Sequence, residues 1–197
     1  MGLTRTRFGV SAGALCVIAI ALMFGATAFL VLVSIAAIVH ELGHYLALRA
    51  MRVRVLSFRL DITGIVLIRE RSATYLQEII IAAAGPAASA ALAILAAAAA
   101  RMTGAGEIYR LSGMSLMFCL FNLLPAHPLD GGKILHSAIS MRARTIMTAE
   151  RILCITGCVV IFILLCTGAY LLIITRTNFT LLFTSLWLLI YSQLSLK

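Results

Sequence analysis

Six long apolar runs, separated by short polar stretches, dominate the chain. Each run approaches the ~20 residues that a helix needs to cross the hydrocarbon core of a bilayer. The pattern therefore predicts an all-α integral membrane protein with about six transmembrane helices. The expected helices cover residues 8–24, 25–48, 75–100, 108–125, 150–174 and 178–194.

Between residues 52 and 69 the apolar residues recur at every second position, a spacing typical of a strand. Gly64 then permits a turn into a second apolar stretch, so the sequence predicts a short β-hairpin after the second helix. Two interpretations remain open. The hairpin either only joins two helices at the surface, or it offers an edge strand that pairs with an extended peptide. The alternating apolar positions are Leu56, Phe58, Leu60 and Ile62.

The composition agrees with a membrane protein that forms one polytopic domain over residues 1–197. Hydrophobic residues make up 62% of the chain and charged residues only 12%, about half the ~25% usual in soluble domains. The apolar run at 8–24 follows two arginines, as in a signal peptide. Hydrophobicity continues beyond it without a polar start, so a retained first helix is preferred to a cleaved one.

The net charge of +9 comes from basic residues in the short loops between apolar runs. With the N-terminus in the cytoplasm, all 16 Lys and Arg residues except Arg101, Arg110 and Arg176 lie on the cytoplasmic side. The positive-inside rule therefore predicts a multi-pass cell membrane protein with both termini in the cytoplasm. Because no basic and aromatic surface for a phosphate backbone is visible, nucleic acid is not expected as a partner.

The motif His40-Glu41-x-x-His44 lies inside one of the apolar runs. On a helix its two imidazoles share one face, one turn apart, with a carboxylate beside them. Ionisable side chains at membrane depth are costly and are usually kept for function. The spacing is typical of a zinc site in a hydrolase, which has three protein ligands and one open position.

Asp130 is the favoured third ligand. It follows a segment in which Pro125, Pro128 and a glycine pair break the fourth apolar run. Irregular backbone at membrane depth is tolerated where it lines a wet cavity. The predicted topology brings Asp130 and the His-Glu motif to the cytoplasmic face and puts Glu107 on the opposite face. The other acidic candidates are Glu70, Glu78 and Glu150.

Three segments together resemble the site-2 protease family of intramembrane zinc metalloproteases: His40-Glu-Leu-Gly-His44, Ala84-Gly-Pro86, and Asn122-x-x-Pro-x-x-Pro-Leu-Asp130-Gly-Gly. The resemblance covers residues 25–140, the expected catalytic core, with additional helices at 8–24, 150–174 and 178–194. It implies one zinc ion per chain, bound by His40, His44 and Asp130. It also implies that Glu41 is the catalytic base and that Asn122 contributes to substrate binding.

The family likeness implies regulated intramembrane proteolysis at a site facing the cytoplasm. The six-run layout is similar to the subgroup typified by the stage IV sporulation protease. The expected substrate is a transmembrane or membrane-associated protein in the lipid bilayer, such as a sigma-factor precursor or an anti-sigma factor, with an inhibitory membrane partner. Two alternatives remain open: housekeeping cleavage of signal-peptide remnants, and a non-enzymatic metal-binding scaffold or transporter.

Overall fold

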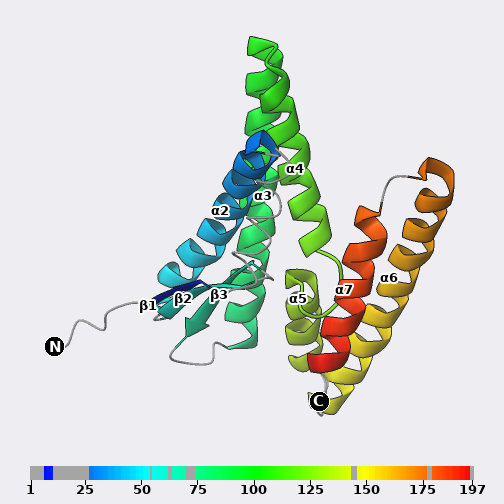
Figure 1. The fold of residues 1–197 in the computed structure, drawn as a ribbon. Helices are drawn as coiled ribbons and strands as arrows, with labels where there is room; N and C mark the ends of the chain where they lie inside the picture. The colour runs from blue at the N-terminus through cyan, green and yellow to red at the C-terminus, as the bar shows by residue number, and fades with distance from the viewer. Residues whose placement is uncertain are drawn as a thin grey trace. The chain divides into compact units, whose positions relative to one another are not determined.

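The chain divides into two compact units, Met1–Leu120 and Phe121–Lys197. The computed structural model describes residues 7–10, 27–53, 55–61, 64–69, 74–142, 146–176 and 179–195 (Figure 1).

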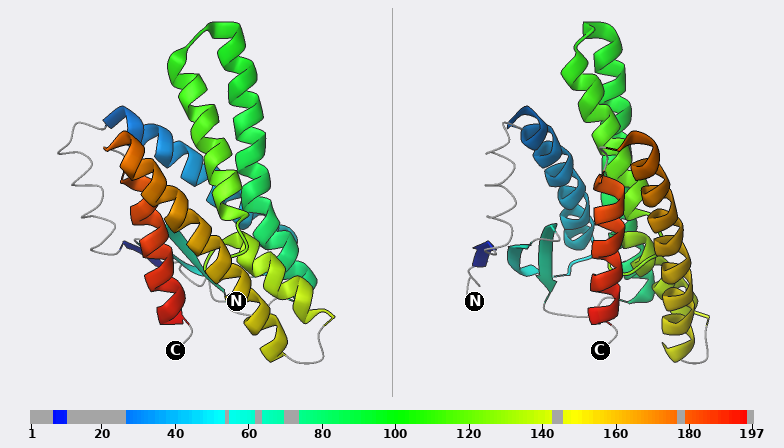
Figure 2. Two further views of the ribbon diagram at one scale, coloured as in Figure 1. Left: turned by 90° about the vertical axis from the view of Figure 1, so that its right-hand side faces the viewer. Right: turned by 45° about the vertical axis from the view of Figure 1, so that its right-hand side comes forward.

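Long helices form most of the first unit. Helix α2 (Thr27–Ala50) packs against α3 (Tyr75–Thr103), and α4 (Gly106–Asn122) follows after a tight reversal, its last two residues belonging to the second unit. The reversal uses Gly104 at φ 69°, a left-handed conformation that glycine adopts without steric cost. At its other end α3 begins with a capping box, in which the side chains of Thr74 and Gln77 each accept from the other's backbone N–H. Two further views show α3 and α4 running side by side (Figure 2).

A three-stranded sheet in the first unit corrects the expected all-α fold. Strands β1 (Arg7–Val10), β2 (Val55–Asp61) and β3 (Gly64–Arg69) pair in the order β1-β2-β3. The pairing of β1 with β2 is parallel, and that of β2 with β3 is antiparallel. Because Leu60 of β2 pairs with both Val10 and Ile65, β2 is the central strand of the described sheet, and β3 lies at its edge. Gly64, where the turn is expected, is the first residue of β3, and Ile62 of the expected first strand lies outside the described residues.

Small residues bring α2 and α3 into close contact. A Cβ added at Gly43 would lie 2.5 Å from the Ala84 carbonyl oxygen and 2.8 Å from the Ala88 Cβ. Contacts between small residues allow helix backbones to approach closely in lipid, where packing rather than water exclusion drives association. The alanine-rich part of α3 is therefore a packing surface for the helix that carries the His-Glu motif.

The second unit consists of α5 (Asp130–Ser140), α6 (Ile146–Thr175) and α7 (Thr180–Ser195). Helices α6 and α7 form a hairpin whose arms lie side by side in all views (Figures 1 and 2). The buried core of the unit joins this hairpin to the loop that precedes α5. Its members are Ala126, Leu129, Ile161 and Leu188.

Three of the described helices are long and apolar enough to cross a membrane, which corrects the expected number of six. Helix α4 has 17 residues and α7 has 16, so each is about 25 Å long, short of the ~30 Å hydrocarbon core. The expected first helix at 8–24 begins with strand β1, and its residues 11–24 lie outside the described ranges. The three candidate spans are Thr27–Ala50, Tyr75–Thr103 and Met147–Thr175.

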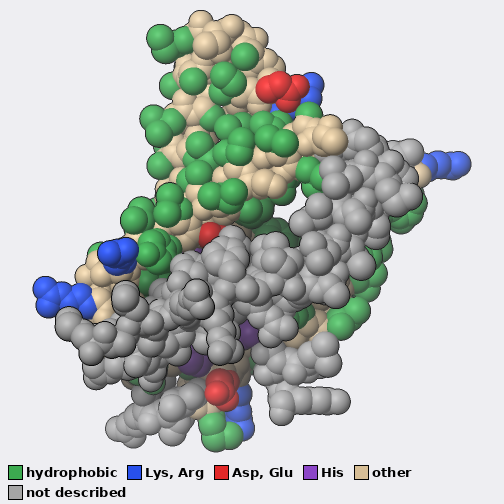
Figure 3. Space-filling model, turned by 60° about the vertical axis from the view of Figure 1, so that its left-hand side comes forward, with side chains coloured by type: hydrophobic (Ala, Val, Ile, Leu, Met, Phe, Trp, Pro, Cys, Tyr) green, Lys and Arg blue, Asp and Glu red, His purple; other side chains and the backbone are tan. Residues whose placement is uncertain are grey.

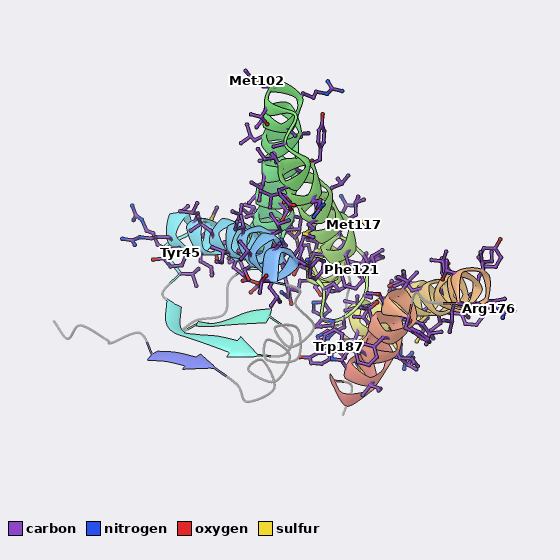
Figure 4. The ribbon with its side chains drawn as sticks, turned by 45° about the horizontal axis from the view of Figure 1, so that its top comes forward. Tyr45, Met102, Met117, Phe121, Arg176 and Trp187 are labelled. Atoms are coloured by element: carbon purple, nitrogen blue, oxygen red, sulfur yellow. The ribbon has the colours of Figure 1, made fainter. Side chains whose placement is uncertain are left out.

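The helix surfaces are apolar, as a lipid environment requires. Large hydrophobic side chains such as Phe162 and Ile173 are exposed. Figure 3 shows hydrophobic side chains over much of the described helical surface on one face, with only a few charged groups. Near the end of α2, Arg49 donates to the hydroxyl of Tyr45, whose position is labelled in Figure 4. The chain is therefore a membrane protein.

We predict that Gly43→Ala destabilises the first unit, because the added methyl group would overlap the backbone of α3. Overpacking of this kind costs about 1–3 kcal/mol, which should lower the thermal midpoint of the detergent-solubilised protein by several degrees. The control is Gly113→Ala in α4, where an added Cβ meets nothing within 4 Å. Equal midpoints for the two variants would contradict the close approach of α2 and α3.

Candidate metal centre

Helix α2 places the two histidines of the motif side by side. The side chains of His40 and His44 are 4% and 8% exposed, and Glu41 between them is half-buried. The two rings meet edge to face with centroids 4.8 Å apart. Their Nε2 atoms are separated by 3.2 Å. The i, i+4 spacing thus brings two potential ligand nitrogens to one point, as the sequence predicts.

The Nδ1 atom of each imidazole makes a hydrogen-bond contact to α3. The Nδ1–H of His44 donates to the backbone carbonyl of Ile81 at 2.7 Å. A carbonyl can only accept, so this contact fixes the proton on Nδ1 and leaves the Nε2 lone pair of a neutral His44 available. The Nδ1 atom of His40 lies 3.0 Å from the hydroxyl oxygen of Ser89. Such outer contacts orient histidine ligands in metal sites.

Two further residues shape the space around the imidazoles. Gly85 lies directly against the His44 ring, and an added Cβ would collide with its Nε2 atom. The aromatic ring of Phe118 from α4 lies 6.0 Å from the His40 ring, centroid to centroid. Ser112 ties α4 to α3 by donating to the Ala93 carbonyl at 2.8 Å. The histidine pair is thus enclosed by three helices of the first unit.

In the second unit Asp130 is the first residue of α5 and is only 3% exposed. Its Oδ1 accepts from the Lys133 ammonium at 2.8 Å. The preceding loop folds tightly against this first turn. A Cβ added at Gly131 would collide with the Leu123 carbonyl, and one at Gly132 would lie 2.5 Å from the Ala126 carbonyl oxygen. The glycine pair therefore lets the chain double back beside a buried carboxylate.

Burial separates Asp130 from the other acidic candidates for a third ligand. Glu78 is half-buried, Glu150 is exposed, and Glu107 is exposed and paired with Arg110 at 2.9 Å. Glu70 lies outside the described residues. Among the acidic side chains whose exposure is described, Asp130 is the buried one. This burial supports Asp130 as the favoured third ligand.

The loop before Asp130 carries two further polar residues. Asn122 is half-buried and is the last residue of α4. His127 stacks on Tyr191 of α7, with ring centroids 6.3 Å apart and planes within 16° of parallel. Partial desolvation lowers the pKa of His127, and the nearby charges of Lys133 and His136 lower it further.

The sequence motifs did not indicate the contacts that α3 makes to the histidines. Ser89 lies in an alanine-rich tract whose composition indicates only close helix packing. The one available signal is spacing, because Ile81, Gly85 and Ser89 recur every four residues and so follow one side of a helix. That spacing becomes informative only when α2 is known to pack against this side.

Comparison with known proteins places the site in a family. A match to peptidase family M50 covers residues 28–109 and 107–165. The chain belongs to this family, the site-2 proteases. The matched residues include the His-Glu motif, Asn122 and Asp130.

Two individual proteins show the likeness further. A Synechocystis protein whose name assigns it provisionally to the zinc metalloproteases is 37% identical over 119 residues, or 57% of this chain. The chain spans about a third (31%) of that relative's length. The site-2 protease from Methanocaldococcus jannaschii has a similar fold, with a TM-score of 0.72 and 21% identity over 98% of this chain and 92% of that one.

Membership confirms the expected likeness to the site-2 proteases, and zinc is the metal that the name of the Synechocystis relative gives for that protein. The donor chemistry of this chain agrees with that metal. Two imidazoles that converge at Nε2 are donors typical of hydrolytic zinc sites. The His44 tautomer is also the correct one for a metal ligand, because its Nε2 carries no proton.

We predict that Gly85→Ala lowers the zinc content of the purified protein to well below half, because the methyl group would displace the His44 ring. Zinc per chain is measured by elemental analysis after purification in detergent. The control is Gly157→Ala in α6, where an added Cβ meets only ordinary contacts of 3.6 and 3.8 Å to Ala126. Full zinc occupancy in a folded Gly85→Ala variant would contradict the contact between Gly85 and His44.

Proposed function

We propose that this chain is an intramembrane protease that hydrolyses peptide bonds of membrane-associated proteins, with zinc bound by His40, His44 and Asp130. The histidine pair carries the proposal: two buried imidazoles converge at Nε2 in a helix apolar enough to span a membrane. The burial of Asp130 supports its role as the third ligand. Open sites of this composition retain a position for water.

Bound zinc in such a site lowers the pKa of a coordinated water and polarises a carbonyl group. The residues of the chain supply the proton transfers. Glu41 follows His40 directly in α2 and is half-buried, so its carboxylate can face the same space. A carboxylate oxygen of Glu41 accepts the proton of the attacking water, whose oxygen bonds to the carbonyl carbon. When the C–N bond breaks, Glu41 returns that proton to the departing amine nitrogen.

Asn122 is proposed to contribute to substrate binding, as the family likeness implies. Its carboxamide offers both donors and an acceptor, which suits a peptide bond. A substrate helix has all its backbone groups paired internally, so it must unwind locally before its carbonyl is open to attack. An amide side chain of this kind replaces one of the hydrogen bonds that the unwound backbone loses.

We further propose that both termini and the opening of the site face the cytoplasm, because the basic residues concentrate on that side of the expected topology. The substrate is proposed to be a membrane-associated regulatory protein, such as a sigma-factor precursor or an anti-sigma factor, held in check by an inhibitory membrane partner. Removal of signal-peptide remnants is the competing substrate class, since it requires the same residues.

We predict that Glu41→Gln reduces proteolysis at least ~100-fold, the lower range of general acid–base contributions, while zinc content stays at the wild-type level. The amide keeps the shape of the carboxylate but cannot accept the proton. Cleavage is measured after co-expression with two tagged substrates, a sigma-factor precursor with a membrane segment and a signal-peptide remnant. Preferential cleavage of one tagged protein identifies the substrate class.

The control for this experiment is Glu107→Gln, which removes an exposed carboxylate paired with Arg110. It should cleave at the wild-type rate. Undiminished cleavage by a zinc-loaded Glu41→Gln variant would show that another group is the base. His40→Ala should lose both zinc and cleavage.

A further inference from the structure

The Ser89 hydroxyl is completely buried and lies 3.0 Å from the Nδ1 atom of His40. It belongs to one side of α3 that also contains Ile81 and Gly85, at intervals of four residues. Helix α2 runs antiparallel to α3 along this side. His44, nearer the C-terminal end of α2, contacts Ile81 and Gly85, and His40, one turn before it, contacts Ser89. Helix α3 therefore gives each imidazole one polar partner.

The two partners differ in the hydrogen bonds that they can make. The Ile81 carbonyl only accepts, so it holds His44 in a single tautomer. The Ser89 hydroxyl can both donate and accept, so it is compatible with either tautomer of His40. The same helix thus contacts the Nδ1 atom of both imidazoles, one through a carbonyl oxygen and the other through a hydroxyl.

The two Nε2 atoms are 3.2 Å apart, so they converge on one point. A metal ion at that point needs the lone pairs of both Nε2 atoms, and a neutral His40 that binds it carries its proton on Nδ1. That Nδ1 atom lies 3.0 Å from the Ser89 oxygen, which can accept the proton in a hydrogen bond.

We propose that Ser89 is a positioning residue for the zinc ligand His40, and that its hydroxyl oxygen accepts a hydrogen bond from the Nδ1–H of His40 when the metal is bound. The inference rests on the proposed zinc site. When Ser89 accepts from His40, its own O–H can turn to a carbonyl one turn earlier in α3, as helical serines commonly do. Ser115 of α4 shows this arrangement, donating to the Leu111 carbonyl at 2.8 Å.

Loss of the hydroxyl should weaken zinc binding more than it weakens the fold. Without it, the Nδ1–H of metal-bound His40 is buried with no acceptor from Ser89, and the ring loses its fixed orientation. Outer contacts to histidine ligands typically contribute tenfold to a hundredfold to metal affinity. We expect a Ser89→Ala variant to bind zinc about 10- to 100-fold more weakly than the wild type.

The test measures the zinc affinity of the full chain in detergent, by titration with Zn²⁺ against a chelator of known affinity. The central comparison is Ser89→Thr with Ser89→Val, since these side chains share a shape and only threonine has the hydroxyl. Threonine should bind zinc at least tenfold more tightly than valine. Ser115→Ala removes another fully buried serine hydroxyl of the same unit and should leave the affinity unchanged.

The outcomes separate this inference from the proposed function. If wild type and His40→Ala bind zinc equally, the zinc site itself is wrong. If wild type binds tightly and Ser89→Ala matches it, only the role of Ser89 is overturned. Equal affinity of the threonine and valine variants, at equal thermal midpoints, would likewise show that Ser89 fills space without acting on His40. Where both larger variants unfold, the comparison of Ser89→Ala with Ser115→Ala decides.

Discussion

The close approach of α2 to α3 is the constraint on which the histidine site depends. At Gly43 the two helices are separated by so little that a single methyl group would meet the backbone of α3. Only at this spacing can the His44 ring reach the main-chain carbonyl of Ile81 and lie directly against Gly85. In lipid, close packing of small residues and polar contacts between helices hold a bundle together. The same contacts that join these helices therefore set the orientation of both imidazoles.

The second unit uses glycine in a related way. Gly131 and Gly132 allow the loop carbonyls of Leu123 and Ala126 to lie against the first turn of α5. The loop is in turn anchored by Ala126 and Leu129, which belong to the core with α6 and α7. Asp130 is consequently buried at a helix start, where the unpaired backbone N–H groups favour negative charge. In both units a glycine replaces a side chain where a proposed ligand residue must lie close to main chain.

The sequence revealed the parts of the site that depend on local geometry. The spacing of His40 and His44 is fixed by helix periodicity alone, and the prolines and glycines around Asp130 mark a broken helix in any context. The number of spans among the described residues was overestimated because α4 and α7 are apolar but too short, a difference of a few residues that composition does not resolve. Strand β1 was missed because its apolar residues continue into the run at 8–24. The contact between Ser89 and His40 was missed because it depends on which side of α3 packs against α2, a property of tertiary packing.

The polar groups of the site are paired within the protein, which separates metal binding from folding. Zinc fingers fold only with their metal, because little else holds them together. Here His44 is paired with Ile81, His40 with Ser89, and Asp130 with Lys133. None of these buried groups therefore depends on zinc to avoid the cost of an unpaired polar atom in an apolar surrounding. The helices pack through Gly43 and the alanines of α3, so substitutions of the ligands can abolish metal binding in a chain that remains folded. A substitution of one proposed ligand can then abolish zinc binding while the helices stay folded. The contribution of each ligand to zinc affinity can therefore be measured separately from its contribution to stability.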